Sequence, residues 1–206
     1  MLNRTKYFRK LCLSGSFLVG LISLSSTANA QFIGINADVA IDYSAAPGKV
    51  SGYSVGISHP APFIPNIGYS YVSFIDKESI TNPSDNSSVS LETTTTIKTI
   101  NLFYNIPFPV VTITVGFGYG ADNLNTGVET ITTIDQVESN LETSVSEAFF
   151  HIGLPFWNTI EFHLGYHFMS FSSIDITKSD KFQGKYPTVK KSYSGGMTTI
   201  GVQVAF

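Results

Sequence analysis

The segment VTITVGFGYG, residues 111–120, alternates strictly between apolar side chains and small or polar ones. Consecutive side chains of a β-strand point to opposite faces of a sheet, so a period of two indicates a strand with one apolar face and one polar face. Residues 160–169, IEFHLGYHFM, repeat this pattern and carry two histidines on the polar side. The chain is therefore predicted to be all-β, with strands whose two faces meet different surroundings.

The connections between such strands are of two kinds. Three are short and each carries a Pro-Phe pair, at residues 59–66, 105–109 and 153–158. Three are long and rich in Thr, Ser, Asn and Asp, at residues 77–92, 122–139 and 178–192. Short turns at one end and long polar loops at the other are typical of an up-and-down outer-membrane barrel, with the short turns on the periplasmic side.

Counting along the chain gives about eight antiparallel strands, an even number that leaves both termini on the periplasmic side. The predicted strands lie near residues 31–43, 50–58, 66–76, 92–105, 109–121, 140–152, 159–177 and 193–206. We therefore predict an up-and-down antiparallel transmembrane β-barrel. A soluble β-sandwich is the architectural alternative, but its outward apolar stripes would face water unless two sheets packed together.

The first thirty residues have the layout of a secretory signal peptide. A basic head is followed by an apolar stretch over residues 11–24 and by the small-residue end Ala28-Asn29-Ala30. This predicts export with cleavage before Gln31, so that residues 1–30 are the signal peptide and residues 31–206 are the barrel. An uncleaved membrane helix is the other interpretation, and it is disfavoured because a span needs about 20 largely apolar residues.

The composition narrows the class of protein further. Charged residues and aromatic residues each make up 13% of the chain, a balance that suits a large surface in lipid. Residues 1–30 hold four of the 12 basic residues and no acidic one, so the mature chain has eight lysines against 15 acidic groups, a net charge of −7. Nucleic acid is therefore not an expected partner. Cys12, the single cysteine, lies in the predicted signal peptide, which excludes disulfides and cysteine-bound metals from the mature chain.

The last strand ends on an aromatic residue: residues 198–206 read TTIGVQVAF and close on Phe206. This resembles the C-terminal strand by which outer-membrane barrels are recognised for assembly, which implies the barrel assembly machinery as a partner. The mature chain resembles the small eight-stranded outer-membrane barrels, the size class of OmpX and the OmpA transmembrane domain, which implies a monomer in the bacterial outer membrane. Residues 58–67, SHPAPFIPNI, are also similar to the first turn of a proteobacterial outer-membrane barrel family of unassigned function.

The same alternation places a set of polar side chains inside the barrel. They are Asn36, Asp38, Asp42, Asn101, Glu147, His151, Glu161, His163, His167 and Gln203. An eight-stranded barrel is only wide enough to be filled by its side chains, so these groups are expected to satisfy one another as a polar plug. A metal or acid-base site is the alternative, but His163 and His167 stand about 13 Å apart along an extended strand and do not share an ion there. No metal or cofactor is predicted.

Two further groups of residues are assigned to the surface. The aromatic residues of the short turns are expected to form a girdle at the periplasmic boundary: Phe63, Phe108, Phe156 and Trp157. The last long loop carries five of the eight mature cations, which are candidates for contact with lipopolysaccharide phosphates: Lys178, Lys181, Lys185, Lys190 and Lys191. Ordinary solvation of a loop explains these lysines equally well.

The sequence favours a non-enzymatic protein with an envelope-structural or surface-interaction role, in contact with outer-membrane lipid and lipopolysaccharide. A narrow channel or carrier is an alternative, although Phe103 and Phe149 are expected to block the lumen. A lipid A-modifying enzyme is another. The His-x-Ser pattern of the deacylase type fails here because Ser170, three residues after His167, falls on the other face. No catalytic residue is assigned.

Overall fold

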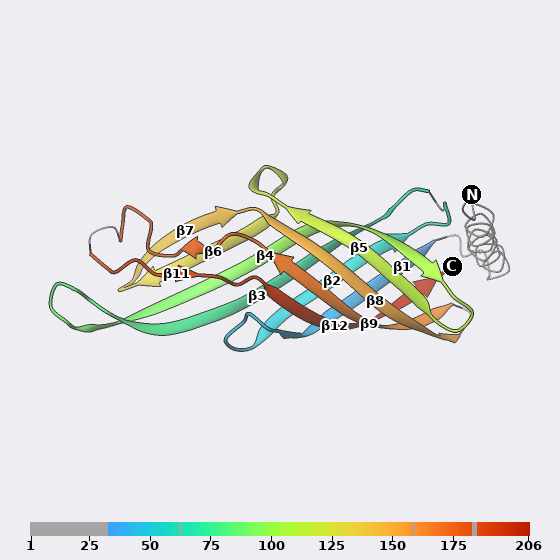
Figure 1. Cartoon of the computed structure of the whole chain (residues 1–206), viewed down its shortest axis with the longest axis horizontal. Helices are drawn as coiled ribbons and strands as arrows, with labels where there is room; N and C mark the ends of the chain where they lie inside the picture. Colours follow the sequence, from blue (N-terminus) through green and yellow to red (C-terminus); the bar gives the residue numbers. More distant parts are fainter. Residues whose placement is uncertain (1–32, 62, 158, 183–184) are drawn as a thin grey trace, which may run out of the picture.

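The computed structural model describes residues 33–61, 63–157, 159–182 and 185–206, and eight of its strands close into an antiparallel barrel (Figure 1). Around the ring the order is β1-β2-β3-β4-β5-β8-β9-β12, and β12 pairs back with β1. The bounds are β1 Gly34–Tyr43, β2 Val50–Ser58, β3 Asn66–Thr81, β4 Ser88–Pro107, β5 Thr112–Gly120, β8 Val145–Trp157, β9 Ile160–Ser170 and β12 Gly195–Ala205. The predicted up-and-down barrel is confirmed. The predicted signal peptide, residues 1–30, lies outside the described residues.

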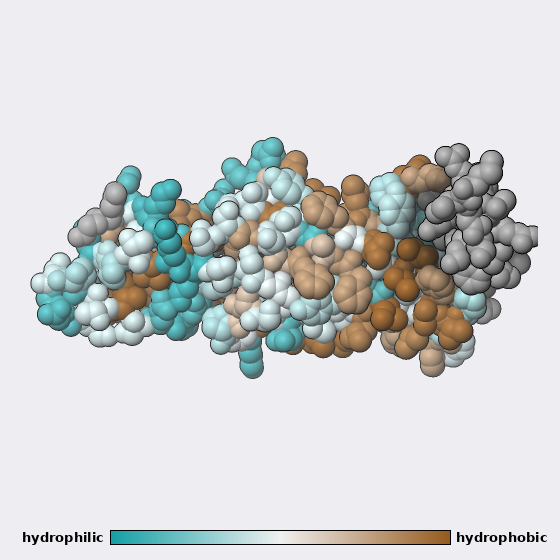
Figure 2. Space-filling model, in the orientation of Figure 1, coloured by the Kyte–Doolittle hydropathy of each residue, from teal (hydrophilic) through white to brown (hydrophobic). Residues whose placement is uncertain are grey.

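The outer face of the barrel is apolar over the end that holds the described termini. Figure 2 shows this hydrophobic region, and the opposite end of the molecule is mostly hydrophilic. The outward side chains of β5 are an example, since Val115, Phe117 and Tyr119 are all exposed. Exposed apolar surface arranged as a belt around a closed barrel is what a lipid environment requires. Within the part of the chain that the structure describes, no helix is long and apolar enough to cross a membrane.

The prediction of long polar loops is wrong for two of the three segments, because these two form β-strands. β3 and β4 stay paired as far as Thr81 and Ser88, and residues 127–143 form a second hairpin, β6 (Gly127–Ile134) and β7 (Val137–Thr143), which continues the sheet on β4. Short pieces complete this region: η2 Asp122–Leu124, β10 Ile174–Asp175 and β11 Lys190–Lys191. Thr is polar in composition but β-branched, so runs such as Thr93–Thr96 favour strands. We name residues 75–95, 122–143 and the described residues of 171–194 the outer extension.

The outer extension has an apolar interior that continues into the outer half of the barrel. Phe74 packs between Tyr43 and Tyr193, with ring centroids 5.6 and 5.1 Å apart, and Ile176 and Phe182 of the segment after β9 are fully buried. This segment also contacts β3 and the β6–β7 hairpin, through Lys191–Glu78, Lys181–Glu138 and Tyr186–Asp135. Apolar side chains fill the outer half, and the polar side chains gather in the other half.

Two local expectations are corrected by the register of the strands. Asp42 is exposed and does not belong to the interior, because a bulge between Ala40 and Asp42 shifts the register of β1 against β12 and turns Tyr43 inward. The third Pro-aromatic segment is also not a turn, since residues 153–157 belong to β8. A further register irregularity near Pro155 accommodates the missing N–H of proline.

Candidate functional site

The half of the barrel nearer the short turns holds a buried polar network on β1, β8 and β9, of which only β8 and β9 are neighbours. β1 contributes Asp38, β8 contributes Glu147 and His151, and β9 contributes His163 and His167. These five side chains are at most 5% exposed. They meet because the strands run β8-β9-β12-β1 around the ring and because each residue lies on the inward set of its strand.

Glycines opposite the large polar groups make the room for them. Gly201 of β12 pairs with both Asp38 and His163, and a Cβ built on Gly201 would lie 2.2 Å from the Asp38 Oδ1 atom. Gly165 pairs with His151 and Thr199, and its Cβ would lie 2.6 Å from the His151 ring. The Asp38 carboxylate and the two imidazoles can therefore approach each other because Gly165 and Gly201 have no side chain between them.

Glu147 is the acceptor at one end of this network. The Thr99 hydroxyl donates to its Oε2 atom, and the His167 Nδ1 atom lies 2.5 Å from its Oε1 atom. His167 in turn meets His151, with their Nε2 atoms 3.0 Å apart. At the other side His163 Nε2 lies 2.8 Å from Glu161 Oε1, and Glu161 also accepts from the Thr112 hydroxyl at 2.5 Å.

This chain of partners assigns the protons on the neutral imidazoles. A carboxylate only accepts, so His167 carries its proton on Nδ1, where it donates to Glu147. The His167 Nε2 atom is then an acceptor, and His151 must donate to it from its own Nε2. His163 likewise donates from Nε2 to Glu161. In this all-neutral state the Nδ1 atoms of His151 and His163 each carry a lone pair and no proton.

Those two Nδ1 atoms face Asp38. They lie 4.0 and 3.7 Å from its Oδ1 atom, too far for hydrogen bonds, and both nitrogens and both Asp38 oxygens lack a hydrogen-bonding partner among the described residues. Asp38, His151 and His163 form the one group of ligand-type side chains in the described part of the chain whose donor atoms all lie within 4.8 Å of one another. These are the residues that can hold a metal ion.

The remaining predicted interior residues lie on either side of this cluster. Asn101 is buried and donates to Ser70 at 2.6 Å, while Asn36 is buried next to Asp38 on the inward face of β1. Gln203 accepts from Asn105 at 3.4 Å toward the end with the short turns. Phe103 and Phe149 are buried inside the barrel with ring centroids 6.3 Å apart, and they fill the lumen beside the network.

Sequence reasoning missed the partners that complete the network, which are Ser70, Thr99, Asn105, Thr112, Thr114 and Thr199. Each has the inward parity of its own strand, so the same alternation carried the signal. Thr99, for example, lies two residues before Asn101 on β4. Five of the six are small hydroxyl residues, which do not stand out because Ser and Thr are frequent throughout this chain.

The aromatic and terminal residues lie at the end with the short turns. Phe63, Phe156 and Trp157 are 92%, 61% and 68% exposed, and Phe108 is also exposed. Phe156 packs edge-on against Trp157 and against Phe162, at centroid distances of 4.9 and 5.6 Å. Phe206 follows β12, and its N–H donates to the carbonyl of Ile33 at 2.8 Å. Their roles as girdle and assembly signal stay predictions.

The five lysines of the last segment have different environments. Lys178, Lys181, Lys185 and Lys190 are exposed, and Lys181 donates to the Glu138 carbonyl at 2.7 Å. Lys191 points inward to Glu78 and Asp76, at 2.5 and 3.1 Å. Partial burial lowers the pKa of Lys191, but the hydrogen bonds to Glu78 and Asp76 outweigh it and hold that pKa above its ordinary value. Lys191 is thus part of the packing of the outer extension.

Replacing Lys191 by methionine is expected to loosen the segment after β9, because Asp76 and Glu78 then lose their cation. The loss is about 1–3 kcal/mol, the range for hydrogen bonds to charged groups. Because the folded pKa is raised, this contribution is complete at neutral pH and disappears as pH rises above about 10. Amide hydrogen exchange of residues 171–182 measures the effect. Lys190→Met is the matched control, and equal loss in both variants contradicts the assignment.

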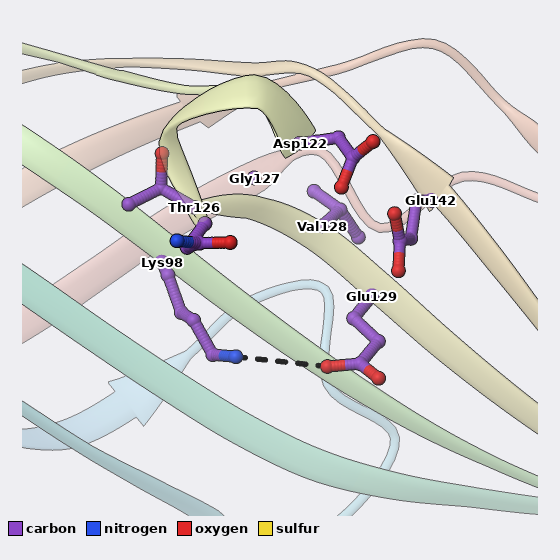
Figure 3. Close-up of a pocket in the computed structure, with 8 residues that line it drawn as sticks. Lys98, Asp122, Thr126, Gly127, Val128, Glu129 and Glu142 are labelled. Atoms are coloured by element: carbon purple, nitrogen blue, oxygen red, sulfur yellow. Dashed lines mark ion pairs between the residues drawn. The ribbon is translucent and has the colours of Figure 1, made fainter.

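A second polar site lies where η2 meets β6 and β7. It is a cavity of about 210 Å³, and Figure 3 shows Asp122, Glu129 and Glu142 around it together with Lys98. Lys98 lies 3.6 Å from Glu129. A hydrogen bond to Asp122 and the charge of that residue raise the pKa of Glu142. No residue of this cavity was a candidate at the level of sequence, since its acids come together only through the β6–β7 hairpin.

Comparisons with known proteins find similar chains among solved structures alone, at low sequence identity. No protein-family model and no curated protein matches the chain. Among solved structures, the N-terminal β-barrel domain of OprF from Pseudomonas aeruginosa is similar at 11% identity and a TM-score of 0.47, over 84% of this chain and 96% of that one. Neisserial surface protein A is similar at 13% identity and a TM-score of 0.47, over 84% of this chain and 97% of that one. The outer-membrane protease OmpT from Escherichia coli is similar at 9% identity and a TM-score of 0.44, over 76% of this chain and 64% of that one.

The assignment of the fold comes from the hydrogen-bonded ring of the chain's own strands. Similarity at this level carries no inference about activity. The chain is an eight-stranded closed antiparallel β-barrel, and the solved structures similar to it are small barrels of bacterial outer membranes.

Proposed function

We propose that this chain is a non-enzymatic integral protein of the bacterial outer membrane that presents a folded β-sheet module at the cell surface. The observation that carries the proposal is the outer extension. It continues β3 and β4 beyond the apolar belt, and it has its own buried side chains, such as Leu91 and Ile134. A loop that served only to connect strands has no need of such a core.

The charges of the outer extension support a role in contact with a partner. Lys77 and Glu92 form an exposed ion pair at 2.6 Å. The Tyr186 hydroxyl donates at 2.8 Å to the carboxylate of Asp135, which lies in the Asp135-Gln136 turn of the β6–β7 hairpin. These contacts pre-order the module, so that a partner that binds it pays little ordering entropy. The filled lumen, with Phe103 and Phe149 inside, supports a surface role over a channel or carrier.

The test uses the absence of cysteine from residues 31–206, which allows a single cysteine to be placed at either end of the barrel. Ser84→Cys lies in the exposed β3–β4 turn, and Val110→Cys lies in the exposed β4–β5 turn. On intact cells a membrane-impermeant maleimide is expected to label Ser84→Cys only, and Val110→Cys is expected to react after the outer membrane is permeabilised. Labelling of both on intact cells, or release of the protein by alkaline carbonate, sinks the proposal.

Contact with lipopolysaccharide is a second part of the proposal and concerns the exposed lysines. Lys178, Lys185 and Lys190 are exposed, and ammonium groups attract anionic phosphates. Their joint replacement by glutamine is expected to weaken binding of the purified barrel to lipopolysaccharide at low salt, with less effect at high salt. Lys77→Gln is the control. Unchanged binding in the triple variant assigns these lysines to solvation alone.

A further inference from the structure

We propose that Asp38, His151 and His163 form a binding site for one divalent transition-metal ion, of the zinc class, inside the barrel. The site joins β1, β8 and β9, of which β1 and β8 are not neighbours in the ring. Two imidazole nitrogens and one carboxylate are donor types that Zn²⁺ takes, and three protein ligands leave a fourth position for water.

The geometry of the three donor atoms fits an ion between them. Ligands bound tetrahedrally to zinc at about 2.0–2.2 Å stand about 3.3–3.6 Å from one another. The two Nδ1 atoms lie 3.7 and 4.0 Å from the Asp38 Oδ1 atom, slightly farther apart than bound ligands and beyond hydrogen-bonding distance. The three donor atoms all lie within 4.8 Å of one another, so movements of about 1 Å bring them to the coordinated spacing.

The hydrogen bonds behind the imidazoles favour metal binding over a simple polar plug. The partners Glu161 and His167 occupy the Nε2 atoms of His163 and His151, which leaves both Nδ1 atoms within 4.0 Å of the Asp38 Oδ1 atom. A carboxylate that accepts from the far nitrogen of a metal-bound imidazole is the usual support of such ligands. A plug would instead use these nitrogens to satisfy the Asp38 oxygens.

The charge balance of the network also calls for a cation. Asp38, Glu147 and Glu161 are three carboxylates, and the side chain of Asp38 is fully buried. No lysine takes part in the described contacts of this network, and both arginines of the chain, Arg4 and Arg9, precede the barrel. An uncompensated buried carboxylate is costly, so Asp38 is either protonated itself or faces a cation, which is a metal ion or a protonated imidazole.

The experiment measures zinc binding by the full mature chain refolded from urea into detergent micelles with zinc chloride. Loading during refolding is used because apolar side chains fill the outer half of the barrel. We expect one zinc per chain after gel filtration, a rise in the unfolding temperature that a chelator present during refolding prevents, and, with cobalt instead, the visible absorption of a tetrahedral ion.

Four variants identify the ligands. Asp38→Asn, His151→Gln and His163→Gln are each expected to weaken zinc binding at least about 100-fold. Removing a residue that only supports a ligand weakens metal binding by about 10–100-fold, so loss of a ligand itself is expected to exceed that range. His59→Gln removes the one histidine outside the network and is expected to bind zinc as the parent does. Heat-modifiable gel mobility selects the folded fraction of each variant.

Zinc stoichiometry that is zero in the parent overturns the proposal and leaves a protonated imidazole or a protonated Asp38 to account for the charge. So does equal zinc binding in Asp38→Asn and the parent, or loss of zinc in His59→Gln. Because two histidine variants and an isosteric amide variant are compared, a single variant that fails to fold leaves the others to decide.

Discussion

Replacing Glu147 by alanine is expected to lower the free energy of unfolding of the barrel by about 3 kcal/mol. Each buried donor left without an acceptor costs about 1–3 kcal/mol, and Glu147 is the acceptor for both the Thr99 hydroxyl and the His167 ring. Its side chain is fully buried, so water does not replace it. Urea titration of the protein in detergent micelles, followed by heat-modifiable mobility, measures the loss.

Two other variants show that the effect comes from the network. Glu147→Gln retains the size of the side chain and one acceptor oxygen, so its free energy of unfolding is expected to fall less than that of the alanine variant. Glu92→Ala removes an acid of an exposed ion pair and is expected to change stability by less than about 1 kcal/mol. If the alanine variants at Glu147 and Glu92 lose equal stability, the interior network contributes nothing specific.

Replacing Gly116 by valine is expected to destabilise the barrel by about 1–3 kcal/mol, because the interior has no space for the added atoms. A Cβ at this position would lie 2.2 Å from the tip of the Phe149 ring and 2.8 Å from the Phe103 Cβ atom. Both rings are rigid and buried, so they cannot turn away toward solvent. Equilibrium unfolding in urea gives the change in stability.

The double variant Gly116→Val, Phe149→Ala tests whether the clash is local. Phe149→Ala alone leaves a cavity and is expected to cost about 3–5 kcal/mol. In the double variant the valine occupies part of that cavity, so the two losses are expected to be less than additive by at least about 0.5 kcal/mol. Strict additivity would mean that Gly116 and Phe149 do not compete for one space.

The local signals in the sequence predicted most of the barrel correctly. Alternation together with the short and long connections identified all eight barrel strands, and alternation also gave the inward parity of Asp38, His151 and His163. These predictions succeed because the period of two is a property of each strand alone and because lipid outside and a narrow lumen inside demand different side chains.

The outer extension shows where local signals failed. Residues 122–139 were expected to be a polar loop because they belong to the stretches rich in Thr, Ser, Asn and Asp. The segment instead forms the β6–β7 hairpin, because β4 is long enough to offer a second pairing edge from Leu91 to Lys98. An available strand edge is a property of the assembled sheet, and no count of residues in the loop reveals it.

The sequence by itself determined the class of fold, the number of barrel strands, the apolar outer face and the absence of cysteine from residues 31–206. Only the tertiary structure decided which inward groups meet. His163 and His167 share a strand and stay apart, whereas His151 and His163 come from neighbouring strands and converge on Asp38 across Gly201. The physical reason is register: alternation assigns each side chain to a face, but the shift of one strand against the next sets the distance between two side chains on that face.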